Sequence, residues 1–437
     1  MSDTIFALAS GEGLCAISVI RVSGPHADPA LRSLCAGQPV PKPRLVALRT
    51  IANPTSGAIL DRCLVIRFLA PASFTGENGF ELHIHGGRAV IVGVLEALGQ
   101  CADLRLAEPG EFTRRAFLNG KLDLTEAEGL ADLIEANTVA QRDQALALAG
   151  GLLRTRADAW RRDILSLQAE VEADIDFSDE GDVPSDVAAA LVTRIEPLCA
   201  DMEAVLADGR RGEILRRGFT VVLAGAPNAG KSSLMNALVR RDVAIVSSVP
   251  GTTRDPIEIS LDLDGLPVTL VDTAGLREAG DDIEKEGIKR ARARADAADL
   301  VLWLSGPDEV YDGLGLLNGS VLPILSKCDL LPADSAPEQK HRISAHTGEG
   351  IEALLGMITD YARAALRPEE PAIMSRQRHR QGISNALEAL HRIKQGLPIE
   401  VGAEELRIAA RSLGAIIGLV SPEDVLGEIF GRFCIGK

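Results

Sequence analysis

The stretch FTVVLAGAPNAGKSSLMNAL at residues 219–238 constrains the fold most, because a β-type apolar run leads into a glycine-rich loop and then a helical pattern. The loop has the spacing G-x-x-x-x-G-K-S, in which Gly225 and Gly230 let backbone amides surround phosphate groups. Lys231 supplies positive charge to the terminal phosphates, and Ser232 supplies a hydroxyl to Mg²⁺. The next helix presents its positive N-terminus to the same anion. We therefore expect a nucleoside triphosphate site rather than a structural turn.

Two further motifs follow in the order that phosphate-sensing loops require. PGTTRD provides Thr252 and Thr253, whose hydroxyl and carbonyl groups can close over a γ-phosphate and Mg²⁺. VTLVDTAG ends a β-type run in Asp272, placed to hold metal-bound water, with the amide of Gly275 free to contact the γ-phosphate. This spacing predicts a nucleotide triphosphatase.

Guanine recognition is predicted from PILSKCD, in which a β-type run ends in Lys327 and Asp329. An aspartate there accepts two N–H groups from guanine that adenine does not offer, and ISAHTGEG (343–350) fits a loop closing over the base. The usual motif is Asn-Lys-x-Asp, and here Ser326 replaces the asparagine. Serine is too short to form both hydrogen bonds of the amide, so we expect weaker nucleotide affinity with guanine selectivity retained through Asp329.

The group that orients the attacking water is not evident from the motifs. Ras-like enzymes place a glutamine directly after DTAG, whereas this chain has Leu276, which cannot hydrogen-bond to water. Acidic candidates lie just downstream, and the residues alone do not choose among them: Glu278, Asp281, Asp282, Glu284 and Glu286.

Composition favours a reduced cytoplasmic protein. No run reaches the roughly 18 apolar residues that a membrane span needs, and the N-terminus lacks the basic and apolar regions of a secretion signal. The seven cysteines are scattered, odd in number and without a C-x-x-C pair, which argues against a disulfide framework or a zinc site. A net charge of −16 disfavours RNA binding by the chain alone unless basic clusters overcome it.

Three basic clusters are candidates for such contacts, and each is equally a solvated helix face: GRRGEILRRG (209–218), KRARAR (289–294) and RQRHR (376–380). HIHGG places His83 and His85 on one face of a strand, but no third metal ligand lies nearby in the sequence.

The pattern of apolar and polar residues along the chain changes three times. Residues 1–115 alternate short β-rich runs with turns and include a helical pattern near 87–103, whereas 122–213 has helical periodicity. A region of alternating β and α patterns follows to about residue 365. Helical patterns then return at 376–397, 402–418 and 422–431. Helical segments on both sides of an α/β region predict a helical domain that carries an inserted domain.

These motifs, together with the terminal Cys-Ile-Gly-Lys, resemble the tRNA-modification GTPases of the MnmE (TrmE) family over essentially the whole length. SFTGE (73–77), HGG (85–87) and PGEFTRRAFLNGKLDL (109–124) add to the resemblance. It implies a multidomain α/β protein in which a Ras-like P-loop GTPase, with a mixed, mostly parallel sheet and flanking helices, interrupts a helical domain. The expected domains are an N-terminal α+β folate-binding and dimerisation domain (1–118), the first helical segment (119–213), the G domain (214–370) and the second helical segment with the tail (371–437).

The resemblance also implies a reaction. Members of this family form homodimers and work with the flavin-containing protein MnmG (GidA), in a complex of heterotetramer type. Together they add an aminomethyl or carboxymethylaminomethyl group to carbon 5 of the wobble uridine of certain tRNAs. The one-carbon unit comes from a tetrahydrofolate derivative, 5-formyl- or methylene-tetrahydrofolate, and GTP, Mg²⁺ and K⁺ are the other cofactors. The lack of a long apolar run predicts no membrane association.

Site residues follow from the resemblance, motif by motif. Folate contacts are implied for Arg21, Glu81, Lys121 and Lys437; Mg²⁺ contacts for Ser232 and Thr253; and K⁺ contacts for Asn228, Ser247, Val249 and Thr252. Glu284 matches the residue that orients water, and K⁺ supplies charge where an arginine finger otherwise acts. The implied nucleotide-binding residues are Asn228, Ala229, Gly230, Lys231, Ser232, Ser233, Ser247, Ser248, Val249, Pro250, Gly251, Thr252, Thr253, Asp272, Thr273, Ala274, Gly275, Ser326, Lys327, Asp329, Ser344, Ala345 and His346.

The tail itself allows three interpretations: a catalytic thiol, a lipid anchor or an idle end. Its Cys434 has the position of a prenylated cysteine, but the final lysine and the glycine do not fit that signal. We expect a tethered thiol that acts as a nucleophile near the folate or the uridine. The competing interpretations of the whole chain are an Era-like regulatory GTPase in ribosome assembly and a folate-dependent methyltransferase with an accessory switch domain.

Overall fold

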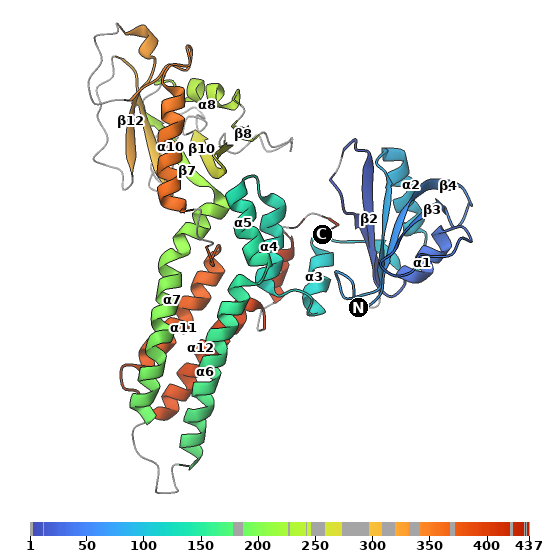
Figure 1. Cartoon of the computed structure of the whole chain (residues 1–437), viewed down its shortest axis with the longest axis horizontal. Coiled ribbons are helices and arrows are strands. Elements are labelled where there is room, and N and C mark those ends of the chain that lie inside the picture. The colour runs from blue at the N-terminus through green and yellow to red at the C-terminus, as the bar shows by residue number, and fades with distance from the viewer. Residues whose placement is uncertain are drawn as a thin grey trace, which may run out of the picture. The chain divides into compact units, whose positions relative to one another are not determined.

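The computed structural model describes residues 3–11, 13–177, 187–225, 228–241, 243–245, 258–272, 297–307, 320–331, 341–367, 372–419, 423–431, 433, 435 and 436. The chain forms two compact units, one of residues 1–131 and 414–437 and one of residues 132–413 (Figure 1). The predicted fold class, several domains with helices and mixed sheets, is confirmed. The four domains proposed from the sequence subdivide these units differently, and their boundaries stay a prediction.

The first unit is built on a six-stranded sheet. Its strands run in the order β3-β4-β5-β2-β1-β6, antiparallel except for the parallel pair β1 and β6. The elements are β1 (Thr4–Leu8), β2 (Ile17–Ser23), α1 (Ala27–Leu34), β3 (Val46–Ala52), β4 (Ile59–Phe68), β5 (Gly79–His85), α2 (Arg88–Gly99), β6 (Leu104–Leu106) and α3 (Glu111–Leu118).

Alternation along the strands separates the two faces of this sheet. In β5, Phe80, Leu82 and Ile84 are buried in the core that α1 and α2 complete, whereas Glu81 and His83 lie on the opposite face. The predicted helix near 87–103 is α2. Burial on one face and polar residues on the other explain why an α+β pattern is visible in the sequence.

The two ends of the chain meet within the first unit. Helix α4 (Leu124–Glu135) follows α3, and α13 (Glu423–Gly431) packs against this region. Leu124, Ala127, Phe430 and Phe433 form a buried cluster, against which Phe117 packs. This apolar cluster holds the last described residues close to the N-terminal sheet.

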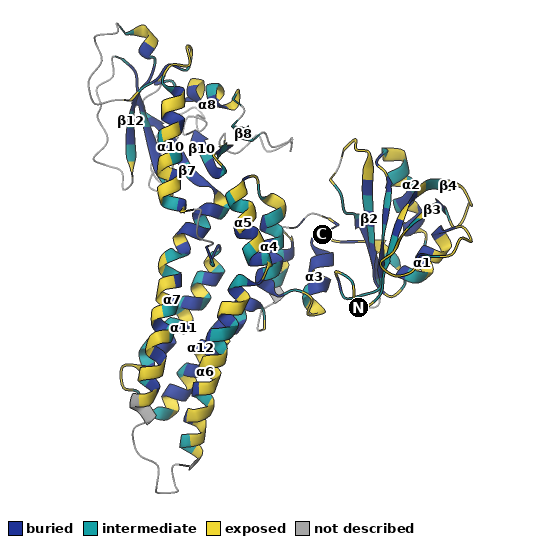
Figure 2. Ribbon diagram, in the orientation of Figure 1, coloured by how far each residue is buried: buried dark blue, intermediate teal, exposed yellow. Residues whose placement is uncertain are grey.

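The helical region of the second unit consists of long amphipathic helices. They are α5 (Val139–Ala149), α6 (Leu152–Phe177), α7 (Val187–Arg217), α11 (Gln377–Ile393) and α12 (Ile399–Ile417), the last of which ends in the first unit. Each has one buried and one exposed side, as the sequence periodicity predicts (Figure 2). Among the described helices, none combines the length and apolarity needed to cross a membrane.

The second unit also contains a seven-stranded sheet in the order β13-β12-β11-β7-β10-β9-β8. The pairs among β7, β10, β11, β12 and β13 are parallel. Strand β9 pairs antiparallel with both β8 and β10. The elements are β7 (Phe219–Gly225), α8 (Lys231–Val239), β8 (Ala244–Ile245), β9 (Glu258–Leu263), β10 (Leu266–Asp272), β11 (Leu300–Ser305), β12 (Val321–Leu325), η3 (Cys328–Leu330), β13 (His341–Arg342) and α10 (Ile351–Leu366).

The segment that follows α10 and leaves this sheet domain makes a close backbone contact with α7. Residues 372–374 lie so near the helix that a Cβ atom on Gly212 would be 1.9 Å from the carbonyl oxygen of Met374. Gln144 of α5 donates a hydrogen bond to the carbonyl of Gly212 at 3.1 Å. Glycine at this helical position therefore allows three segments to meet at one point.

Candidate functional site

The glycine-rich loop lies between β7 and α8, as predicted. Gly225 ends the buried strand with a φ of 136°, and a Cβ there would be 2.1 Å from the carbonyl oxygen of Leu304 in β11. Gly230 has a φ of 92° and caps α8. Both positions require glycine, the first because of backbone crowding and the second because of its left-handed conformation. The loop therefore directs the N-terminus of α8 toward the site.

The two polar groups expected near the phosphates are both held in place. Lys231 is buried, and its Nζ donates to the carbonyl oxygen of Gly225 at 2.9 Å. The Oγ of Ser232 donates to Oδ2 of Asp272 at 3.2 Å. Because β10 pairs in parallel with β7, Asp272 reaches the same edge of the sheet as the loop. The structure thus brings together a hydroxyl and a carboxylate, the oxygen donors that Mg²⁺ prefers.

The residues predicted to read guanine surround a cavity of about 120 Å³. Its lining includes Gly230 and Ser233 from the loop and helix, Ser326, Lys327 and Asp329 after β12, and Ser344, Ala345 and His346 after β13. A hydrogen bond from Ser344 holds the pKa of the Asp329 carboxyl below its ordinary value. An ionised carboxylate at this edge can accept N–H donors from a base.

Ser326 has a role in this structure that its short side chain did not indicate. Its Oγ lies 2.6 Å from the carbonyl oxygen of Ala229 and 3.1 Å from that of Ser305, and it is buried. The serine therefore links the segment between β12 and Asp329 to the glycine-rich loop. Its single proton serves these protein carbonyls, so it has no second donor for a base.

Several predicted residues cannot be placed. Asn228 is described and has a left-handed φ of 66°, a conformation that asparagine tolerates. The others lie outside the described residues: Ser247, Ser248, Val249, Pro250, Gly251, Thr252, Thr253, Thr273, Ala274, Gly275, Glu284, Cys434 and Lys437. The four alternatives to Glu284 and the basic cluster at 289–294 lie outside them as well.

Two residues predicted to contact folate are neighbours on the sheet of the first unit. Arg21 of β2 pairs in register with Glu81 of β5, and Nε of the arginine donates to Oε1 of the glutamate at 3.0 Å. Oε2 of the same glutamate lies 3.5 Å from Nε2 of His83. Within the described residues, the terminal nitrogens of Arg21 have no hydrogen-bond partner. The pair therefore offers cationic donors beside a carboxylate.

Lys121 lies near this region of the unit, above the loop that joins β4 to β5. A Cβ on Gly76 would be 3.3 Å from Cε of Lys121. The loop is tied down by the buried Arg115, which sequence reasoning missed as a site element. Its bonded partner Glu77 is 38 positions away, so no local pattern reveals the contact.

The two strand histidines have separate carboxylate partners. His83 faces Glu81, whereas Nδ1 of His85 lies 2.8 Å from Oδ1 of Asp61. Burial raises the pKa of Asp61, but hydrogen bonds from the backbone and ring of His85 and from the amide of Arg62 bring it below its ordinary value. No group of three metal-ligating side chains occurs in the described residues of the chain.

The end of the chain is docked on the first unit. Ile435 forms an antiparallel bridge with Pro109, and a Cβ on Gly436 would be 2.1 Å from the carbonyl oxygen of Leu8. Gly436 also has a φ of 97°. Both described neighbours of Cys434, Phe433 and Ile435, thus contact the unit that carries Arg21 and Glu81.

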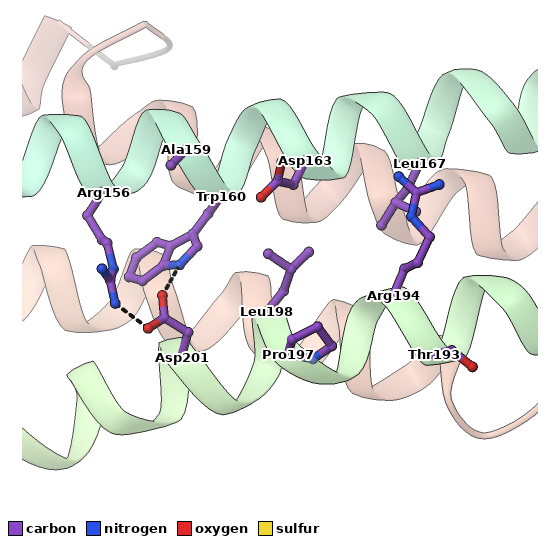
Figure 3. Close-up of a pocket in the computed structure, with 10 residues that line it drawn as sticks. All are labelled: Arg156, Ala159, Trp160, Asp163, Leu167, Thr193, Arg194, Pro197, Leu198 and Asp201. Atoms are coloured by element: carbon purple, nitrogen blue, oxygen red, sulfur yellow. Dashed lines mark hydrogen bonds and ion pairs between the residues drawn. The ribbon is translucent and has the colours of Figure 1, made fainter.

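A larger groove lies between α6 and α7, and none of the predicted residues lines it (Figure 3). Its volume is about 610 Å³. Asp201 accepts a hydrogen bond from Nε1 of Trp160 at 2.6 Å and forms an ion pair with Arg156. Pro197 lies inside α7 beside the groove, where proline removes one helical hydrogen bond. The carboxylate of Asp201 and the guanidinium of Arg156, joined by a dashed line in the figure, neutralise each other.

Comparison with known proteins agrees with the motifs. Residues 4–121 match the model of the GTP-binding protein TrmE N-terminus, and residues 124–434 match the model of the MnmE helical domain. A tRNA modification GTPase MnmE of Bradyrhizobium sp. is 51% identical, covering 100% of this chain and 99% of the relative. The chain belongs to the MnmE family of tRNA modification GTPases. As a member of the MnmE family it is a GTP hydrolase, as its motifs predict.

Other comparisons extend this result. The tRNA modification GTPase MnmE of Parvibaculum lavamentivorans is also 51% identical, with 100% of both chains covered. Among solved structures, the G domain of the T. maritima FeoB iron transporter is 28% identical. It covers 33% of this chain and 98% of its own, with a TM-score of 0.26.

Proposed function

We propose that this MnmE-family chain is a K⁺-stimulated cytoplasmic GTPase that acts on tRNA. With a flavin-containing partner, MnmG (GidA), it installs an aminomethyl or carboxymethylaminomethyl group at C5 of the wobble uridine of certain tRNAs. A tetrahydrofolate derivative supplies the one-carbon unit. The observation that carries this proposal is the full-length identity of 51% to relatives named tRNA modification GTPase MnmE.

The loop and the sheet edge support the nucleotide chemistry of the proposal. Lys231 would exchange its bond to Gly225 for the terminal phosphates, because a buried ammonium needs an acceptor in either state. Ser232 would hold Mg²⁺ with Thr253, and Asp272 would hold metal-bound water. Mg²⁺ supplies charge neutralisation at the β- and γ-phosphates. Asp329 would accept the guanine N–H groups in the adjacent cavity.

Potassium dependence rests on Asn228 together with Ser247, Val249 and Thr252. Asn228 lies exposed in the loop between β7 and α8, three residues before Lys231, so its side chain is accessible to an ion at the phosphates. Glu284 would orient the attacking water, in place of the absent glutamine. GTP hydrolysis should be faster in KCl than in NaCl, and Asn228→Ala should reduce that difference; equal rates for the unmodified protein would contradict the potassium dependence.

Folate binding is supported by the Arg21–Glu81 pair. The terminal nitrogens of Arg21, which have no hydrogen-bond partner among the described residues, suit an anionic ligand together with Lys121 and Lys437. Glu81 suits the N–H donors of a pterin. For Glu81 to accept those donors, its present bond to Arg21 must lengthen or be shared. Arg21→Ala and Glu81→Gln should therefore each weaken binding of 5-formyltetrahydrofolate.

A homodimer is supported by the face of the sheet that α1 and α2 leave uncovered. Val46, Leu48 and Leu64 are exposed apolar residues of β3 and β4 on this face, and Leu48 pairs in register with Leu64. The register of β4 and β5 places Leu64 beside His83, so the apolar patch adjoins the proposed folate residues. Sedimentation analysis should give a dimer, and Leu48→Glu should shift it toward a monomer.

The docked tail supports a role for Cys434 near the folate or the uridine. Its thiol would act as a nucleophile, with Lys437 nearby, and Cys434→Ser should abolish tRNA modification while GTP hydrolysis continues.

Nucleoside analysis of bulk tRNA from a strain that lacks the protein is the deciding test. Loss of the modified wobble uridine, restored by the unmodified gene, is the expected result. Unchanged wobble uridines together with a ribosome-assembly defect would favour the Era-like alternative instead.

A further inference from the structure

The loop between β4 and β5 presents an aromatic ring to solvent. Phe74 is 39% exposed, whereas Phe6, Phe80 and Phe112 of the same unit are buried. Exposure of a single phenylalanine is common in proteins and needs no explanation alone. Phe74 differs from a typical exposed phenylalanine because the loop that carries it is bonded to β2, to the residue after α3 and to the buried Arg115.

Hydrogen bonds fix the residues that follow Phe74. The hydroxyls of Thr75 and Ser23 lie 2.6 Å apart, and Nδ2 of Asn119 donates to the carbonyl of Thr75 at 2.7 Å. Ser23 also donates to Glu77 at 2.7 Å. The loop is thus bonded to the end of β2 and to the residue after α3, so its aromatic residue does not need to be ordered when a ligand binds.

A buried arginine anchors the same loop from below. Arg115 is 1% exposed and contacts Glu77 at 3.2 Å, Glu111 at 3.2 Å and Asp3 at 3.0 Å. A buried guanidinium is stable only with such compensation. Removing it would break these three contacts, while Arg105 would still pair with Asp3 and Glu111. The network therefore fixes the position of the Phe74 loop relative to the sheet.

Phe74 lies beside Arg21, one of the residues proposed to contact folate. Its ring centroid is 5.2 Å from the guanidinium carbon of Arg21, the partner of Glu81. Two residues further along, Gly76 lies under the side chain of Lys121. An exposed aromatic ring in a well-bonded loop therefore lies beside the Arg21–Glu81 pair, and the same loop contacts Lys121 at Gly76.

We infer that Phe74 forms one wall of the folate site and contacts the flat pterin ring of the ligand. A ligand with a planar heterocycle, N–H donors and an anionic tail matches this set of groups. The heterocycle would pack on the Phe74 ring, the N–H donors would contact Glu81, and the anionic tail would contact the cations. The inference rests on the proposed folate binding and adds a residue that determines which ring system is accepted.

Isothermal titration of 5-formyltetrahydrofolate into the full-length protein tests the inference. Phe74→Leu keeps the apolar bulk and removes the ring, so its Kd should rise roughly threefold to tenfold. Phe74→Tyr keeps the ring and should bind within about twofold of the unmodified protein. Val92→Ala, an exposed apolar truncation on α2, is the matched surface control and should not change the Kd.

A second ligand separates contact with the pterin from an effect through Arg21. p-Aminobenzoyl-glutamate lacks the pterin but keeps the anionic tail, so Phe74→Leu should leave its Kd unchanged. Equal weakening of both ligands would show that Phe74 only shields Arg21, and an unchanged Kd for 5-formyltetrahydrofolate would also overturn the inference. Failure of the unmodified protein to bind 5-formyltetrahydrofolate would instead contradict the proposed folate function itself.

Discussion

Replacing Gly212 with alanine should separate α7 from the segment that leaves the G domain. An ideal Cβ at this position would lie 1.9 Å from the carbonyl oxygen of Met374, and 3.0 Å from both Cβ of Ala372 and Nε2 of Gln144. Real Cβ contacts essentially never fall below 3.0 Å, so the backbones must move apart by more than an ångström. A carbonyl oxygen cannot rotate away as a flexible side chain can.

The expected change in the free energy of unfolding combines one stabilising contribution with two destabilising ones. Alanine in place of glycine inside a helix stabilises by about 1 kcal/mol. Overpacking of this kind costs about 1–3 kcal/mol or more, and loss of the Gln144 hydrogen bond adds roughly 1 kcal/mol. We therefore expect a net destabilisation of about 1–3 kcal/mol at this contact. Gly356, exposed inside α10 with nothing within 4 Å of its Cβ position, provides the control, and Gly356→Ala should stabilise α10 by about 1 kcal/mol.

Amide hydrogen exchange measures the two helices separately, which matters because a single unfolding midpoint is poorly defined for a chain of several domains. Exchange in peptides from the end of α7 and from 372–376 should accelerate by roughly 5- to 150-fold in Gly212→Ala. Exchange in α10 should slow by roughly fivefold in Gly356→Ala. If α7 exchanges in Gly212→Ala as slowly as in the unmodified protein, close packing of α7 against 372–374 is wrong.

Three further changes test other regions of the structure. Ser326→Ala removes the bond to the carbonyl of Ala229 and should weaken GDP binding or loop stability by about 1–3 kcal/mol in total, measured by titration and thermal unfolding; no change in either would refute the link. Burial raises the pKa of the Cys63 thiol to about 12, so at pH 8 about one molecule in ten thousand is thiolate. Iodoacetamide at pH 8 should thus modify the exposed Cys15 and not Cys63, as mass spectrometry would show. Gly436→Ala should displace the tail and lower tRNA modification with GTP hydrolysis intact; full modification would argue against a role for the docked tail.

The nucleotide site could be anticipated because its signals are local. Gly225, Gly230 and Lys231 fall within seven residues of a strand–loop–helix pattern, and the structure gives that pattern. Asp272 was predictable from the end of an apolar run, since parallel strands place such ends at one edge. The conformation of such a motif depends on residues close together in the sequence, so it can be predicted without knowing what packs around it.

Contacts between distant residues could not be anticipated in the same way. Ser326 appears in the sequence only as a departure from Asn-Lys-x-Asp, and its bond to a loop carbonyl spans 97 positions. Arg115 looks like any helical arginine, yet it binds Asp3 over 112 positions. In each case the partner is fixed by tertiary packing, which neither propensity nor periodicity encodes.

The basic runs in the sequence show why charge must be assessed in three dimensions. Among the described residues of 209–218, Arg211 is buried against Asp208, and Arg217 forms two hydrogen bonds with Asp299.

In the 376–380 run, Arg376 pairs with Asp132 and Arg380 with Glu213. A guanidinium already paired with a carboxylate must give up that partner before it can neutralise a phosphate, so it contributes little to counterion release. The paired arginines of these two runs therefore serve to join α7, α11 and the G domain, and they do not offset the net charge of −16 for an RNA backbone.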